Sequence, residues 1–171
     1  FYSEVPRVLR KGVIQIDVAM IQVSPPDTHG YCSLGVSVEA SIAAVENSKI
    51  VIAQVNPNMP RTFGDGILHV SEIDYLVEVN EEIHGHGSNE INATEAKIGE
   101  LVAGLIEDES TLQMGIGSIP NAVLAKLVNH KNLGLHTEMF SDGVIDLIEN
   151  DVINCNYKGV NRGRALATFL I

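Results

Sequence analysis

The stretch STLQMGIGSIPNAVLAKLVNHKNLGLHTEM, residues 110–139, contains a complete strand–turn–helix–strand pattern. Two largely apolar segments, residues 110–114 and 133–139, have the length of short strands. Between them, a glycine-containing turn at 115–120 leads into a helical pattern at 121–129. A crossover of this kind is right-handed and makes its two strands parallel. The stretch therefore predicts two parallel strands whose carboxyl ends lie at the same edge of a sheet.

Strands and helices also alternate on either side of this stretch, which is typical of α/β proteins with a largely parallel sheet. One face of the first predicted strand carries apolar residues at every second position: Ile14, Ile16, Val18 and Met20. The further predicted strands are 13–23, 49–56, short strands within 67–79, 152–155 and 164–171. The further predicted helices are 38–48, 92–108 and 143–150. The polar segment 80–92 is a predicted loop. The predicted fold class is α/β, with an open, largely parallel sheet and helices on both faces.

The composition limits the classes of function. A chain of 171 residues suits one ordinary domain, and 45% hydrophobic residues argue against wholesale disorder. The 22 acidic and 11 basic residues give a net charge of −11, which disfavours binding to nucleic acid and to anionic membranes. Two distant cysteines, Cys32 and Cys155, form no disulfide framework and suit a reducing compartment. No apolar run reaches the roughly 20 residues of a membrane span. We therefore expect a cytoplasmic protein.

Both ends of the chain predict that it is a piece of a longer protein. The first residues, FYSEVPRVLRKG (1–12), have neither an initiating Met nor an apolar targeting core. The last residues, ALATFLI (165–171), stop inside an apolar run, as an interrupted strand would. We therefore expect residues 1–171 to be a segment of a larger protein.

Glu138 ends the second strand of the 110–139 stretch, at the edge where the first strand enters its glycine turn. A charged carboxylate beside a buried strand costs desolvation energy unless it is solvated or partnered. The carboxyl edge of an open α/β sheet is also where such folds bind ligands. Glu138 is therefore either an ordinary surface acid or a functional residue that shares an edge with residues 115–117.

The turn at Gly115, Ile116 and Gly117 presents backbone N–H groups just before a helix. Such groups can bind an anion, either a phosphate or a developing oxyanion. A tight strand-to-helix turn without any ligand is an equally ordinary interpretation. A dinucleotide site is a further alternative, because Glu138 falls near the position of the acid that binds ribose, although Pro120 occupies the place of the third small residue.

Three histidines have less specific surroundings. His84 and His86 lie in a polar loop without further Cys or His nearby, so we expect them to be solvated and predict no metal site. His136 has the same parity along its strand as Glu138, and we expect it to orient or pack rather than to react.

Four separated segments occur in an order that carries a family resemblance: VSPPDTHGY (23–31), HVSEID (69–74), QMGIGSIPNAVL (113–124) and LGLHTEMFSDGVIDLIE (133–149). With them the whole chain resembles the acetyl-CoA hydrolase/transferase family, particularly its members that use 4-hydroxybutyrate, butyrate or acetate. The resemblance implies a CoA-transferase-like fold in a two-domain protein. Residues 1–171 would then be mostly the end of the N-terminal domain, with the C-terminal domain absent.

The resemblance also implies a function and the residues that perform it. Glu138 would be the nucleophile of a ping-pong transfer of CoA between a short-chain acyl-CoA and a free carboxylic acid, through a glutamyl-CoA thioester. Gln113 and the N–H groups of residues 115–117 would stabilise the oxyanions or contact CoA. No metal or cofactor would be needed besides CoA as substrate, and the protein would form a homo-oligomer. The alternatives are an acyl-CoA hydrolase, a nucleotide-binding oxidoreductase and a non-catalytic fragment.

Overall fold

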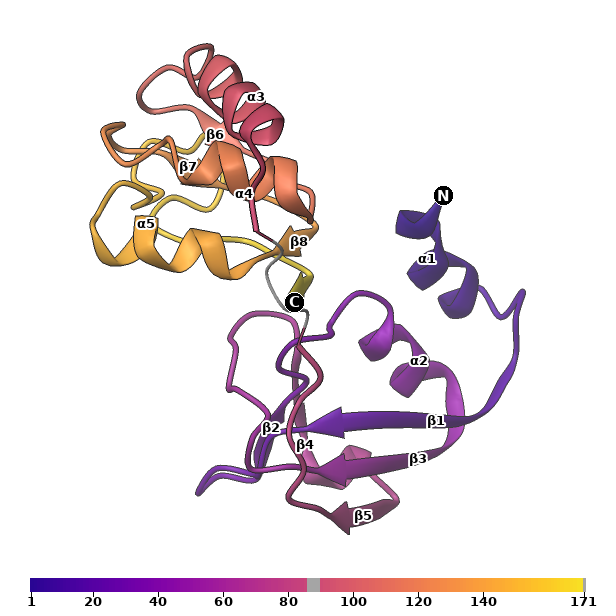
Figure 1. Cartoon of the computed structure of the whole chain (residues 1–171). Helices are drawn as coiled ribbons and strands as arrows, with labels where there is room; N and C mark the ends of the chain where they lie inside the picture. The colour runs from indigo at the N-terminus through magenta and orange to yellow at the C-terminus, as the bar shows by residue number, and fades with distance from the viewer. Residues whose placement is uncertain (86–89, 171) are drawn as a thin grey trace. The chain divides into compact units, whose positions relative to one another are not determined.

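The computed structural model describes residues 1–85 and 90–170 of the chain (Figure 1). The chain divides into two compact units, one spanning 1–84 and the other beginning at Gly85. The division falls inside the polar segment 80–92, whose described residues form neither helix nor strand, as predicted. The length suits one ordinary domain, whereas the structure has two compact units, each with its own hydrophobic core.

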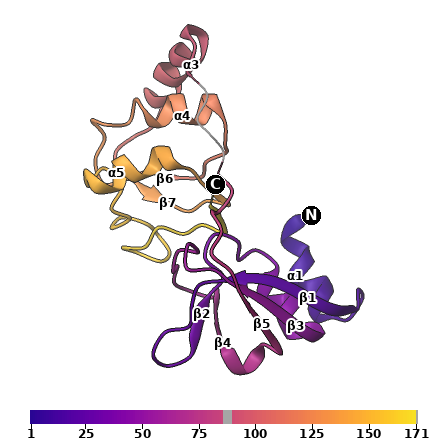
Figure 2. The same cartoon turned by 60° about the horizontal axis from the view of Figure 1, so that its bottom comes forward.

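The first unit is built on a parallel sheet in the order β1–β3–β5 (Figure 2). Strands β2 and β4 form a separate antiparallel pair. Helix α2 packs on β1 and β3, and α1 packs on α2. The elements are α1 (Val5–Arg10) after a 3-10 turn (Tyr2–Glu4), β1 (Ile16–Val23), β2 (Tyr31–Ser33), α2 (Ser41–Asn47), β3 (Ser48–Val55), β4 (Ile67–His69), a second 3-10 turn (Val70–Glu72) and β5 (Tyr75–Glu78). The predicted strands and helix of this unit are thereby confirmed, with shifts of a few residues at their ends.

The core of the first unit lies on the face of β1 that carries Val23. The alternating residues Val18 and Met20 occupy the opposite face, and Met20 is 80% exposed. Their neighbours on β3 are Ile50 and Ile52, so this second face is apolar as well. Strands of parallel sheets carry apolar residues on both faces, and alternation therefore identifies the strand without identifying its buried side. The core residues are Val23, Cys32, Leu34, Ala53, Val55 and Leu68.

The second unit contains the predicted strand–turn–helix–strand arrangement. Strands β6 and β7 pair in parallel, as do β8 and β9. Isolated parallel bridges join Leu133 to Ile153 and His136 to Leu166. The elements are α3 (Ala93–Ala103), β6 (Thr111–Leu112), α4 (Ser118–Leu124), β7 (Gly134–Leu135), β8 (Met139–Phe140), a 3-10 turn (Asp142–Val144), α5 (Ile145–Glu149) and β9 (Phe169–Leu170). The parallel α/β class is confirmed, although the strands are shorter than predicted.

Helix α3 begins within one residue of its predicted start, α4 begins three residues before its predicted start, and both end earlier than predicted. The Asn92 side chain accepts from the N–H groups of Thr94 and Glu95, and Glu95 accepts from the Asn92 N–H, which completes the capping box. Helix α4 begins at Ser118 rather than at residue 121, with Pro120 in its first turn. After Leu124 the backbone changes to tighter bonds that reach back three residues, and these end the helix before the predicted residue 129.

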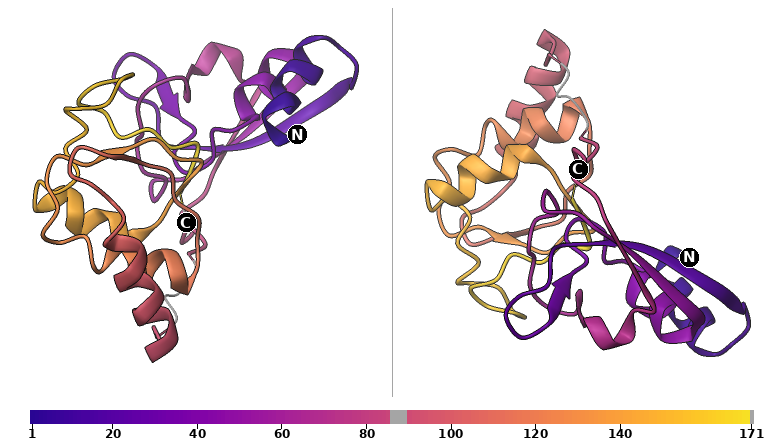
Figure 3. Two further views of the ribbon diagram at one scale, coloured as in Figure 1. Left: turned by 90° about the horizontal axis from the view of Figure 1, so that it is seen from above. Right: turned by 90° about the horizontal axis from the view of Figure 1, so that it is seen from below.

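The core of the second unit surrounds the central strand β7. Leu133 and Leu135 are completely buried, and Leu124 contributes from α4. The two views of Figure 3 show α3 and α4 side by side. The full core is Ala103, Leu124, Leu127, Leu133, Leu135, Val144, Leu147, Val152, Ile153 and Cys155. Within residues 1–85 and 90–170, no helix combines the length and apolarity needed to cross a membrane.

Candidate functional site

The carboxyl ends of β6 and β7 are direct neighbours. The register places Thr111 opposite Gly134 and Leu112 opposite Leu135. The ladder continues past the strands, because the His136 N–H donates to the Leu112 carbonyl at 2.9 Å. Gly115 and Glu138 each follow three residues after the Leu112–Leu135 pair, beyond the ends of these two strands. The predicted meeting of the two strand ends at one edge is therefore confirmed.

Thr137 fixes the two strand ends to each other at this edge. Its side chain is 4% exposed. Its hydroxyl accepts from the Met114 N–H at 3.0 Å and shares its proton between the carbonyls of Met114 and Met139, both also at 3.0 Å. Because Met114 immediately precedes Gly115 and Thr137 immediately precedes Glu138, this one hydroxyl sets the distance between the turn and the carboxylate. Sequence reasoning placed no role on Thr137, since a buried hydroxyl has no distinctive spacing.

The backbone of Glu138 is held on its other side by the last strand. Its carbonyl accepts hydrogen bonds from the Thr168 N–H at 3.1 Å, the Thr168 hydroxyl at 3.0 Å and the Phe169 N–H at 3.0 Å. The Glu138 side chain, in contrast, is exposed. A fixed backbone with an exposed carboxylate is an arrangement that can present a nucleophile or a ligand to a bound molecule.

The turn opposite Glu138 offers unused hydrogen-bond donors. Gly115, Ile116 and Gly117 are exposed. Their N–H groups make no hydrogen bond to another atom within the described residues. Gly117 has φ +106°, a conformation that glycine adopts readily and other residues rarely do, and it directly precedes α4. The sequence-predicted glycines thus form an exposed turn with available N–H groups.

Gln113 and His136 lie one step back along the same two strands. Each directly follows one residue of the Leu112–Leu135 pair, and both residues are exposed. By parity, His136 shares a face of its strand with Glu138, and Gln113 shares that face across the pair. Gln113, His136, Glu138 and the glycine turn are therefore all exposed and follow the ends of the two paired strands.

The start of α4 is anchored from α3. The Ser118 hydroxyl, next to Gly117, donates to the Glu95 carboxylate at 2.5 Å. This hydrogen bond, followed by the one from the Asn92 N–H, lowers the pKa of the Glu95 carboxyl below its ordinary value of 4.5. The capping box of α3 therefore also fixes the residue that follows the glycine turn.

The contribution of the Thr137 hydroxyl to stability and to the position of Glu138 can be tested with Thr137→Val in the full-length protein. Valine has the same shape but leaves the Met114 N–H without its partner, which typically costs about 1–3 kcal/mol of stability. We expect a lower urea midpoint and a lower rate of any reaction that needs Glu138 beside the turn. Thr137→Ser, which keeps the hydroxyl, is the control and should retain most of both. An unchanged midpoint in the valine variant would contradict this role.

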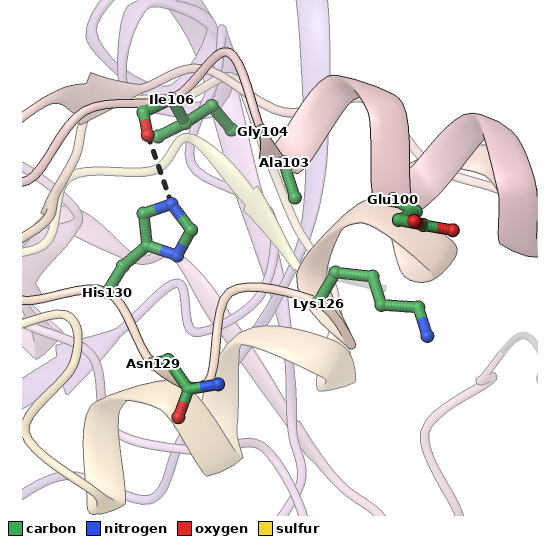
Figure 4. A pocket seen from close by; sticks show the side chains of 7 residues that line it. All are labelled: Glu100, Ala103, Gly104, Ile106, Lys126, Asn129 and His130. Atoms are coloured by element: carbon green, nitrogen blue, oxygen red, sulfur yellow. Dashed lines mark hydrogen bonds between the residues drawn. The ribbon is translucent and has the colours of Figure 1, made fainter.

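A surface pocket of about 360 Å³ lies elsewhere in the second unit. Figure 4 shows it between the end of α3 and the turn after α4, where the His130 Nε2–H donates to the Ile106 carbonyl at 3.0 Å. Its lining residues are Glu100, Ala103, Gly104, Ile106, Lys126, Asn129 and His130. None of them is a predicted site residue, so the candidate site is the exposed β6–β7 edge rather than this pocket.

The histidines and cysteines of the described residues give little support for metal-binding or thiol chemistry. Among residues 1–85 and 90–170, no three His, Cys, Asp or Glu side chains are placed to hold a metal ion. His84 is described, whereas His86 lies outside the described residues. Cys32 and Cys155 are buried and unbonded to each other, as predicted, and burial raises the pKa of the Cys32 thiol. A raised thiol pKa lowers the fraction of reactive thiolate.

Comparison with known proteins identifies the same family as the sequence motifs. Residues 1–85 match the acetyl-CoA hydrolase/transferase N-terminal domain. Over 171 residues the chain is 50% identical to the 4-hydroxybutyrate coenzyme A transferase of Clostridium kluyveri. This alignment covers all of this chain and 40% of that protein. It is 45% identical over 172 residues to the succinyl-CoA:acetate/propanoyl-CoA:succinate CoA transferase of Fasciola hepatica, covering 36% of that protein. The chain thus spans about two fifths of the length of these relatives.

Solved structures give the same result. The 4-hydroxybutyrate CoA-transferase of Porphyromonas gingivalis superimposes with a TM-score of 0.91 at 41% identity, over 99% of this chain and 43% of that one. RipA of Yersinia pestis superimposes with a TM-score of 0.95 at 35% identity, over 99% of this chain and 39% of that one. The parallel α/β units and these neighbours define a fold of the CoA-transferase class. The chain belongs to the acetyl-CoA hydrolase/transferase family.

Proposed function

We propose that the full-length protein transfers CoA between a short-chain acyl-CoA and a free carboxylic acid, with Glu138 as the covalent nucleophile. The observation that carries this proposal is the position of Glu138. Its exposed carboxylate lies between β7 and β8, three residues after the Leu135 pair that joins β7 to β6, and β6 leads into the Gly115–Gly117 turn. The names of the relatives, which include transferases for 4-hydroxybutyrate and succinyl-CoA, support the same reaction class.

The proposed reaction proceeds by two exchanges at one carboxylate. A Glu138 carboxylate oxygen attacks the thioester carbonyl, the C–S bond breaks, and an acyl-glutamyl anhydride and CoA thiolate result. The thiolate then attacks the glutamyl carbonyl carbon of the anhydride, which forms a glutamyl-CoA thioester and releases the first acid. A second carboxylate repeats both steps in reverse, so that a new acyl-CoA leaves and the Glu138 carboxylate is restored.

Each tetrahedral intermediate in this scheme carries an oxyanion that needs hydrogen-bond donors. Gln113, Gly115, Ile116 and Gly117 are exposed just after β6, the strand that pairs with β7, so we assign the Gln113 amide and the three N–H groups to oxyanion stabilisation or CoA contact. The loss of one such donor typically lowers the rate by about 10²–10³-fold. Every bond in the scheme is made or broken by a carboxylate or a thiolate, and we therefore propose CoA as a substrate and no metal or other cofactor.

The setting of the reaction is proposed from the sequence and the family. The net charge of −11 suits small acidic substrates held by local donors rather than nucleic acid or anionic membranes. The cytoplasm is the proposed compartment, because both cysteines are free and buried. A homo-oligomer and a second domain outside residues 1–171 follow from the family resemblance.

An acyl-CoA hydrolase is the second candidate, because the Glu138 side chain is exposed within the described residues. An anhydride or thioester at this position is hydrolysed if water reaches it. Transfer therefore requires that bound substrates, or parts of the full-length protein beyond residue 171, cover the carboxylate during the reaction. A nucleotide-binding oxidoreductase is not favoured, since Pro120 in the first turn of α4 takes the place of the third small residue.

The proposal is tested by trapping the intermediate on the full-length protein. Incubation with an acyl-CoA followed by borohydride should convert the carboxyl group of Glu138 to an alcohol, which peptide mass mapping locates. Adding an isotopically labelled carboxylic acid then separates transfer, which yields labelled acyl-CoA, from hydrolysis, which yields only free acid. Thioester cleavage with no adduct on the peptide containing residue 138 would refute the covalent role of Glu138.

A further inference from the structure

Lys158 is an unusual member of the second unit's interior. Its side chain is only 2% exposed. Its Nζ donates to the Leu135 carbonyl at 2.7 Å and to the Arg164 carbonyl at 2.8 Å. Within the described part of the chain this ammonium group makes no ion pair with a carboxylate. Burial of a cation without an opposite charge is costly, so the two carbonyl bonds must offset a substantial desolvation penalty.

The two carbonyls mark a break in a parallel ladder. Further along it, Leu166 donates to the Leu135 carbonyl at 3.2 Å, and Thr137 donates to the Leu166 carbonyl at 2.9 Å. By the same pattern, the preceding rung would join the Leu135 N–H to the Arg164 carbonyl. Instead, the Leu135 N–H donates to the Cys155 sulfur at 3.3 Å. Lys158 Nζ takes the place of that missing rung.

The path of the Lys158 side chain depends on a glycine. A Cβ at Gly134 would lie 2.6 Å from Cγ and 3.2 Å from Cδ of Lys158. Gly134 lies on the face of the strand that, by parity, also carries His136 and Glu138. The aliphatic part of the Lys158 side chain therefore packs over Gly134, on the face of the strand that carries Glu138.

We infer that Lys158 is a positioning residue for Glu138. This inference rests on the proposed function. Lys158 closes one end of the ladder between residues 135–138 and 164–169, and the other end of that ladder holds the Glu138 carbonyl through Thr168 and Phe169. Without the lysine bridge the 164–169 segment loses its attachment at the first rung, and the backbone of Glu138 loses its fixed position. Lys158 thus acts on the reaction through the backbone and not by contact with the substrate.

Lys158→Met in the full-length protein tests the inference. Methionine fills similar space but donates no hydrogen bond, so we expect the rate constant for forming the Glu138 adduct to fall on the order of 10–100-fold, as for a small misplacement of a reacting group. The KM for acyl-CoA should change by less than about threefold, because the substrate contacts remain. The amides of Thr168 and Phe169 should exchange hydrogen faster. Lys131→Met, at an exposed lysine of the same unit, is the matched control and should change none of these.

A coupled pair of variants tests the same inference through Gly134. Gly134→Ala should displace the lysine stem and lower the adduct rate constant by on the order of tenfold. In a Lys158→Ala background the same change should cost less than about twofold, because Cγ and Cδ are gone. The contact of the new Cβ with the Thr111 hydroxyl, 2.8 Å away, is present in both backgrounds and cancels in the comparison. Equal losses in both backgrounds would overturn the inference.

The readouts separate the inference from the proposed function. A wild-type protein that forms no adduct refutes the function, while faster exchange at Thr168 and Phe169 in Lys158→Met still establishes the bridge. A wild-type adduct together with an unchanged rate constant in Lys158→Met overturns the inference alone. Should Lys158→Met fail to fold, the Gly134→Ala variant decides, since a wild-type adduct rate constant there would equally overturn it.

Discussion

Replacement of Glu138 by alanine in the full-length protein should abolish CoA transfer. The loss in kcat should be on the order of 10⁴-fold or more, the size found when a covalent nucleophile is removed. The fold should remain, because the Glu138 side chain is exposed and its structural contacts are made by its carbonyl, which alanine retains. Steady-state transfer from an acyl-CoA to a labelled carboxylic acid measures the effect.

Two conservative variants sharpen the interpretation of this loss. Glu138→Gln keeps the size but removes the charged nucleophile, and it should be as inactive as the alanine variant. Glu138→Asp keeps a carboxylate one methylene short of its position, so it should retain some activity well below wild type. Glu149→Gln, at an exposed acid that ends α5, is the control and should transfer normally. Transfer by Glu138→Ala at a rate close to that of wild type would refute the assignment.

The structure explains why a carboxylate at this position can react. A nucleophile needs a fixed backbone and a free side chain, and Glu138 has both, because its strand is bonded to β6 on one side and to residues 166–169 on the other. The donors proposed for the oxyanion follow the end of the neighbouring strand β6. The spacing between attacking group and donors is therefore set by a strand register and one threonine hydroxyl.

Much of this arrangement follows from local sequence rules. The glycine turn and the helix after it predicted the β6–α4–β7 crossover. The capping box of Asn92 and Glu95 also follows a local rule, because its two residues are three apart in the chain. The placement of the ends of β6 and β7 at one edge followed from the parallel crossover. The family resemblance, carried by four separated motifs, supplied the chemistry that these patterns alone left open.

The remaining features depend on contacts between distant residues. A lysine in a polar loop gives no local sign that it is buried, yet Lys158 crosses the strand at Gly134 because only there does the strand lack a side chain. The predicted strand at 152–155 is reduced to a single bridge at Ile153, since residues 154 and 155 both donate to the Leu133 carbonyl and the chain turns away. Periodicity cannot foresee such diversions of backbone hydrogen bonds.

Gly99→Ala should be the most destabilising change on the α3–α4 interface, although alanine normally stabilises a helix interior by about 1 kcal/mol over glycine. Gly99 is buried in α3, and a Cβ there would lie 2.4 Å from the Ala122 carbonyl oxygen and 2.6 Å from its carbon. These atoms are backbone, so no side-chain rotation relieves the clash and α4 must move. Overpacking of this kind costs about 1–3 kcal/mol or more. Native-state hydrogen exchange of the α3 and α4 amides measures the loss of stability.

The same variant should also slow CoA transfer, because the glycine turn leads directly into α4 and moves with it. Gly104→Ala is the matched control: its Cβ would lie 3.5 Å from the carbonyls of Glu100 and Leu101, an ordinary contact, and its φ of −66° suits alanine. We expect the control to change stability by no more than about 0.5 kcal/mol and to leave the rate unchanged. If Gly99→Ala proved as stable as Gly104→Ala, the close packing of α3 on α4 would not hold, and the glycine turn before α4 would be positioned by another contact.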